Sequence, residues 1–155
     1  MTTKTWRFIS LILGALAMGM HLAHALELPP KLGWDIELYL PVQTSLYKLF
    51  GSIGPVLEIG ALISISILAY QLRGRERIFK LTALSAGMIV LALITWGLFV
   101  LPANGHIAQW QVDVFPADWT RWRDQWQFGQ AGIFILHLIG FSALISSVLM
   151  ETPDS

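Results

Sequence analysis

Four long apolar stretches alternate with short polar segments along the chain. They cover residues 6–28, 53–72, 78–101 and 128–150. Each is close to the ~20 residues that an α-helix, rising ~1.5 Å per residue, needs to cross ~30 Å of hydrocarbon. No water inside a bilayer can bind backbone N–H and C=O groups, so the stretches should be helical. The pattern predicts an all-α fold: a four-helix transmembrane bundle in which residues 1–155 form a single integral membrane domain with interfacial segments on its outer face.

The composition agrees with a membrane location and narrows the chemistry. Of the 155 residues, 55% are hydrophobic and 13% are charged, which is too little charge to cover a soluble globule. Ten basic residues balance ten acidic ones, so we expect no nucleic-acid partner. The absence of cysteine excludes thiolate catalysis, iron–sulfur clusters and cysteine-ligated zinc. The expected partner is the lipid bilayer, and small residues such as Ala15 and Gly19 also permit the close helix contacts of a homo-oligomer.

Basic residues gather at one end of the predicted bundle. Lys4 and Arg7 precede the first span. The turn between the second and third spans carries four more basic residues, namely Arg73, Arg75, Arg77 and Lys80. The other two connections hold more acidic than basic residues. Because basic flanks stay in the cytoplasm, this asymmetry predicts that both termini are cytoplasmic.

The first stretch also has a second interpretation. Its basic start, the apolar run 8–20 and the tripeptide Ala23-His24-Ala25 resemble a secretory signal with its cleavage site. Cleavage would remove His21 and His24. It would also leave three spans, which does not fit a charge pattern that places both ends inside. We therefore favour a retained span.

The segments on the outer side are rich in proline and aromatic residues. The pair Pro29-Pro30 is predicted to end the first helix. A helix is predicted to resume at Gln43 and to run into the second span. Trp119, Trp122 and Trp126 recur at i, i+3 and i+7, which predicts a short amphipathic helix lying on the membrane surface. That helix would serve either as an aromatic anchor belt or as an aromatic rim over a ligand entrance.

Several polar residues lie within the apolar stretches. Glu58 lies about a turn and a half inside the second span, where an ionisable group costs several kcal/mol unless it has a partner. His21 and His24 are three residues apart and share a face of the first span. Depths counted along the helices place Gln130 and His137 of the fourth span near them. We expect these groups to converge in the outer half of the bundle, either as a reactive cluster or as interhelical hydrogen bonds.

The same residues permit a metal site. His21, His24, Glu58 and His137 offer ligand types that suit zinc, iron or copper. The His-x-x-His spacing differs from the i, i+4 pairing of helix-borne zinc sites. A bis-histidine haem, with axial ligands from the first and fourth spans, is also geometrically allowed. The first expectation is no cofactor, and a haem or a transition metal is the alternative.

Four short motifs resemble those of a known family. They are His21-x5-Glu27-x-Pro29-x-Lys31, residues 46–51 followed by Glu58, Pro102-Ala103-Asn104, and Trp122-Arg123-Asp124-Gln125-Trp126. In these motifs the chain resembles the anthrone oxygenase-like family of small four-span integral membrane proteins, most of whose bacterial members have no assigned function. The resemblance covers nearly the whole chain. It implies a bacterial inner (cytoplasmic) membrane as the location and a small lipophilic aromatic compound as the substrate.

The resemblance also implies a reaction. Characterised relatives oxidise an anthrone to an anthraquinone with molecular oxygen and without an obvious cofactor. By analogy, His21 and Glu58, together with His24, would form the catalytic group that removes a substrate proton. The residues expected to bind the substrate are Asn104, Arg123, Trp126, Gln130 and His137.

Two of these residues carry specific expectations. Arg123 would hold a phenolate or a carboxylate, and Asn104 would bind a carbonyl. Gln130 stands where we associate the family with a histidine, and a glutamine cannot act as a base, so an identical mechanism is not implied. Two other functions stay open from the sequence: a haem- or metal-binding membrane redox protein, and a non-catalytic membrane subunit.

Overall fold

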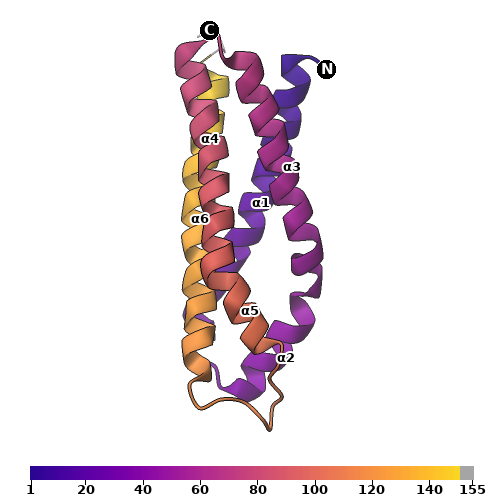
Figure 1. Cartoon of the computed structure of the whole chain (residues 1–155), viewed down its shortest axis with the longest axis vertical. Helices are drawn as coiled ribbons and strands as arrows, with labels where there is room; N and C mark the ends of the chain where they lie inside the picture. The colour runs from indigo at the N-terminus through magenta and orange to yellow at the C-terminus, as the bar shows by residue number, and fades with distance from the viewer. Residues whose placement is uncertain (151–155) are drawn as a thin grey trace.

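The computed structural model describes residues 1–150, which form a bundle of four long helical rods (Figure 1). The long helices are α1 (Thr3–Lys31), α3 (Lys48–Leu72), α4 (Glu76–Thr95) and α6 (Trp119–Leu149). Helix α4 continues through a π-helical turn, η1 (Trp96–Val100), into α5 (Leu101–Ile107). A shorter helix, α2 (Ile36–Leu46), joins α1 to α3. No strand is present among residues 1–150, and the predicted all-α four-helix bundle is confirmed.

The four rods have the length and apolar character of membrane spans. They comprise α1, α3, the combined segment Glu76–Ile107, and α6. Large apolar side chains project outward from them, including Phe8, Val56 and Leu98, which are all at least 65% exposed. Such surfaces are stable against lipid rather than against water. The protein is therefore a multi-pass membrane protein.

Several helix boundaries differ from the prediction. A helix begins at Ile36 rather than at Gln43 and ends at Leu46, so α2 does not run continuously into the second span. The pair Pro29-Pro30 does not end α1 at residue 28, because the helix continues to Lys31 and the Leu32 N–H still bonds the Leu28 carbonyl. The prolines thus occupy the last turn, where few later residues depend on the hydrogen bonds that they lack. The tryptophan-rich segment 119–126 is not a separate surface helix. It forms the first two turns of α6, since no proline interrupts residues 119–149.

The rods are arranged so that α1 contacts α3 and α6, while α4 contacts α6 and α3. The start of α1, the end of α6 and the short α3–α4 turn lie at one end of the bundle (Figure 1). Helix α2 and the loop 108–118 lie at the opposite end. Helices α4 and α6 approach closely at Gly140, where an added Cβ would lie 2.9 Å from the Met88 Cβ. This contact ties the two helices together near the end that carries the chain termini.

A bend separates α4 from α5. Within η1 the Leu101 N–H bonds the Trp96 carbonyl, five residues back, and Pro102 has no N–H to give to the preceding turn. The side-chain amide of Gln125 donates to the Phe99 carbonyl at 2.9 Å, which satisfies one acceptor in the irregular turn. Beyond the bend, α5 leans away from α6 and toward α2 (Figure 1). The bend therefore makes room inside the bundle beside α3.

Candidate functional site

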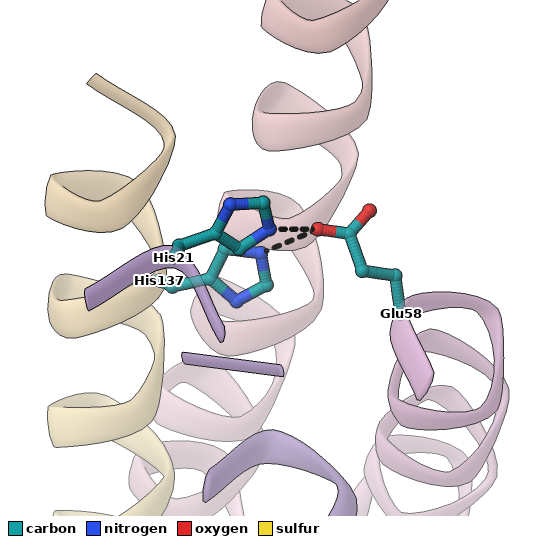
Figure 2. Close-up of side chains that lie close together, drawn as sticks. All are labelled: His21, Glu58 and His137. Carbon is teal, nitrogen blue, oxygen red and sulfur yellow. Dashed lines mark hydrogen bonds and ion pairs between the residues drawn. The ribbon is translucent and has the colours of Figure 1, made fainter. Parts of the chain in front are cut away.

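Three polar side chains from three different helices meet inside the bundle: His21 of α1, Glu58 of α3 and His137 of α6. The His21 Nε2 lies 2.5 Å from the Glu58 Oε1, and the His137 Nε2 lies 3.1 Å from the same oxygen. The two imidazole rings are stacked, with centroids 4.8 Å apart and planes inclined by 23°. Figure 2 shows both rings directed at one carboxylate oxygen while the other oxygen points away from them. The predicted contact between His21 and Glu58 is confirmed.

Gln130 fixes the state of His21. The His21 Nδ1 lies 2.9 Å from the Gln130 Oε1, and a carbonyl oxygen can only accept, so Nδ1 carries the hydrogen that is donated. In a neutral imidazole the Nε2 then has a lone pair and no hydrogen. That lone pair faces the Glu58 oxygen at 2.5 Å, so a proton has to lie between the two atoms. Gln130, which the sequence analysis placed near His21, thus hydrogen-bonds His21 directly.

An apolar cavity of about 690 Å³ adjoins this cluster. Every helix and the π-helical turn η1 contribute to its walls, and its polar lining includes His21, Glu58 and Gln130. Residues without large side chains on α3, namely Gly51, Gly54 and Pro55, leave much of the space free. Thr44 and Lys48 line the cavity and are exposed, so it opens near the α2 end. Glu58 is about 15 Å further along α3 than Lys48, at ~1.5 Å per residue, which places the polar cluster at the inner end.

A second polar network borders the cavity near its mouth. The Tyr47 hydroxyl donates to the Glu27 carboxylate, and the Lys31 ammonium donates to both. Lys31 is only 1% exposed, and its Nζ lies 4.1 Å from the Tyr47 ring centroid and 5.4 Å from that of Trp126. Burial, reinforced by the bond to Glu27, raises the pKa of Tyr47 above its ordinary range. The charges of Lys31 and Glu27 balance each other, and Tyr47 is the member of the network that lines the cavity.

Glu27 and Lys31 belong to the first of the four motifs, and Tyr47 belongs to the second, but none of the three was predicted to take part in the site. A signal was present on α1, because His21, His24, Glu27 and Lys31 follow one another at intervals of three or four residues. Such spacing places all four on one face of the helix. The partner Tyr47 could not have been identified, since it comes from a different element.

Three predicted residues lie elsewhere on the cavity wall. His24 is buried among the rings of Tyr47, Phe50 and Trp126, with centroids 4.9–5.1 Å away. Its Nδ1 is 3.8 Å from the Glu27 Oε2, and it makes no bond to Glu58. Trp126 donates its indole N–H to the Asn104 Oδ1 at 2.8 Å, and both residues line the cavity.

Two predicted substrate-binding residues do not line the cavity. Arg123 bonds the Asp124 carboxylate at 2.8 Å and the Trp34 carbonyl at 3.3 Å, and its guanidinium lies over the Trp119 ring. It is therefore a structural residue that ties the start of α6 to the α1–α2 loop. His137 lies behind the cavity wall and contacts two residues of that wall, Glu58 by a hydrogen bond and His21 by ring stacking.

The cluster offers one group of metal-ligand types within residues 1–150, made of His21, Glu58 and His137. One ligand atom from each lies within 4.8 Å of the others. His24 is not part of it. The arrangement differs from a bis-histidine haem site, because the two rings stack side by side and face one carboxylate, whereas axial histidines approach a porphyrin from opposite sides.

Comparison of the chain with known protein families, with curated proteins and with solved structures finds no match. The function is therefore inferred from the cavity and the polar cluster.

Proposed function

We propose that the protein is a membrane enzyme that oxidises a small lipophilic aromatic compound with molecular oxygen. The observation that carries the proposal is the position of the His21–Glu58 contact at the inner end of an apolar cavity of about 690 Å³. A large apolar pocket with a few convergent polar groups is the usual form of a small-molecule site. The resemblance to anthrone oxygenases supplies the substrate class and the oxidant.

The reaction is the conversion of an activated ring methylene into a ketone. One O₂ reacts with one R₂CH₂ group to give one R₂C=O and one water. The methylene carbon loses four electrons and O₂ gains four, so no external reductant is needed. One oxygen atom enters the new carbonyl and the other leaves as water with the two hydrogens of the methylene group.

The cavity wall suits a flat aromatic substrate with a carbonyl group. The rings of Phe50, Trp96 and Trp126 contribute apolar faces against which aromatic rings pack. The Asn104 Oδ1 is occupied by the Trp126 N–H, so its amide NH₂ is the group left to donate to a substrate carbonyl. This contact would direct the opposite side of the substrate toward His21 and Glu58. Removal of a substrate proton by that pair stays a prediction.

The test is oxidation of an anthrone by the purified protein in detergent, followed by quinone absorbance and by oxygen consumption. We expect one O₂ per ketone formed and a rate well above that of detergent alone. Glu58→Gln should abolish the excess rate. His106→Ala is the matched control, because His106 stacks on Trp122 at 3.6 Å and does not line the cavity. Equal rates in wild type, Glu58→Gln and detergent alone would refute the proposal.

We further propose that the chain lies in the bacterial inner membrane with both termini in the cytoplasm. The basic residues of the first turn of α1 and of the α3–α4 turn share one end of the bundle (Figure 1), as the positive-inside rule requires. Because the chain has no cysteine, single cysteines report the orientation directly. A thiol reagent that does not cross membranes should label Asp113→Cys in intact spheroplasts, and should label Gly74→Cys only after permeabilisation. The reverse pattern would contradict this orientation.

A further inference from the structure

We propose that His21, Glu58 and His137 together bind one divalent transition-metal ion, and that this ion is iron(II). The ligand atoms are in place on three separate helices. The Glu58 Oε1 lies 2.5 Å from the His21 Nε2 and 3.1 Å from the His137 Nε2, and one ligand atom from each residue lies within 4.8 Å of the others. Two neighbouring ligands of one ion, each about 2.0–2.2 Å from it, are roughly 3.0–3.4 Å apart. Binding therefore requires the 2.5 Å contact between His21 and Glu58 to open by about 0.5 Å or more, and ligand atoms as far apart as 4.8 Å to close by more than about 1 Å.

The hydrogen bond from His21 to Gln130 has the form that a metal ligand requires. A histidine that binds a metal through one ring nitrogen donates the N–H of the other to a carbonyl or carboxylate, which fixes its tautomer. His21 donates Nδ1–H to the Gln130 Oε1 at 2.9 Å and turns its Nε2 lone pair toward Glu58. A metal ion can take the place of the proton between that lone pair and the carboxylate. The second imidazole, directed at the same oxygen, provides a further ligand that a single proton could not use.

The donor set suits both iron(II) and zinc, and the proposed function decides between them. Two imidazoles and one carboxylate with open positions are the facial ligand set of non-haem iron(II) oxygenases, and they also suit zinc. Zinc has no redox chemistry, whereas iron(II) binds oxygen, so the choice of iron rests on the proposed function. The metal site itself does not depend on the proposed function. His21 and Glu58 line the cavity, so positions left open on the ion would adjoin the substrate space.

His24 is excluded from the ligand set by its position. It lies one turn further along α1, it is enclosed by aromatic rings, and its Nδ1 is turned to Glu27 at 3.8 Å. The two histidines of the His-x-x-His sequence therefore differ in role: His21 is a metal ligand and His24 is not. The metal site also gives a role to His137, which does not line the cavity and contacts it through Glu58 and His21.

Metal binding is tested without turnover. The purified full-length protein is stripped with a chelator and dialysed in detergent against iron(II) without oxygen, or against cobalt(II), whose visible absorption reports coordination. The number of metal ions bound per protein chain is then measured. We expect one ion per chain in wild type and at least about 100-fold weaker binding in His137→Ala, with about 10- to 100-fold weaker binding in Gln130→Leu. His24→Ala and His106→Ala should still bind one ion. Gel filtration and helicity measured for each variant ensure that folded proteins are compared.

Three results would overturn the inference. One is a folded wild type that binds neither ion stoichiometrically. Another is loss of binding in His24→Ala that equals the loss in His137→Ala. The third is full anthrone oxidation by the chelator-treated protein with no metal present, which would overturn the assignment of iron while the proposed function would stand. Conversely, stoichiometric binding that depends on His21, Glu58 and His137, without oxidation of any anthrone, would support the metal site and refute the proposed function.

Discussion

Replacement of Gly140 by alanine tests the packing that positions the site. Gly140 lies on α6, the helix that also carries Gln130 and His137. A Cβ at this position would lie 2.9 Å from the Met88 Cβ and 3.2 Å from the Ser85 carbonyl oxygen. Both atoms are fixed to the backbone of α4 and cannot rotate away. Since non-bonded carbons prefer a separation of about 3.5–4.0 Å, α4 and α6 would have to move apart.

The expected cost follows from two opposing effects. Overpacking a close contact costs about 1–3 kcal/mol. Alanine is a better helix former than glycine by up to ~1 kcal/mol, which offsets part of that cost. The control Gly132→Ala, on the same helix, has the same gain in propensity and no atom within 4 Å of the added Cβ. The difference in unfolding free energy between the two variants should therefore be about 2 kcal/mol, with Gly140→Ala the less stable.

The free energy is measured by SDS titration of the protein in mild detergent, with helicity and tryptophan fluorescence as independent probes. Coincident transitions for both probes are required before the two variants are compared. If Gly140→Ala proved as stable as Gly132→Ala, the α4–α6 contact would be looser than described. The argument from close approach at Gly140 would then be refuted.

Three further predictions concern the cavity and its wall. Gly51→Phe should fill the cavity and abolish anthrone oxidation while unfolding free energy changes little; Gly87→Phe, outside the lining and also open, should retain activity. Asn104→Leu should cost about 1–3 kcal/mol in the same titration, because it leaves the buried Trp126 N–H unpaired, and adding Trp126→Phe should recover part of this loss. Finally, burial and Glu27 raise the pKa of Tyr47, so the folded protein keeps a proton that the unfolded chain loses above pH ~10. Tm should therefore fall as the pH rises past this value, and it should fall less steeply in Tyr47→Phe.

Much of the fold could be predicted from the sequence, because the length of an apolar stretch directly determines whether it crosses a bilayer. The meeting of His21 with Glu58 could be predicted for a related reason. An ionisable group inside a span is costly without a partner, and depth along each helix shows which partners are level with it. The tryptophan-rich segment 119–126 was misjudged because its polarity suggested a surface location, whereas helix continuity depends on the absence of a breaker.

Other features of the site depend on helix rotation, which the sequence does not determine. His21 and His24 differ by about 60° around α1, so only the packing of α1 against α3 and α6 decides which of them reaches Glu58. Arg123 matched a motif, yet its guanidinium bonds Trp34 and Asp124 outside the cavity. The cavity itself arises from missing side chains, such as those at Gly51 and Gly54, and from the bend at η1. No pattern of neighbouring residues in the sequence indicates that such a cavity exists or how large it is.

The π-helical turn η1 has an evolutionary consequence. A turn with five-residue bonding holds about one residue more than an α-helical turn, and it does so by winding less per residue. The helix that follows therefore keeps nearly the rotational phase that it would have without the additional residue. Deleting a single codon within 96–100 should restore a regular helix and leave Asn104 and Ile107 on the same face of it. Length variation within these five codons is therefore expected to be tolerated better than in a regular α-helical turn of the bundle.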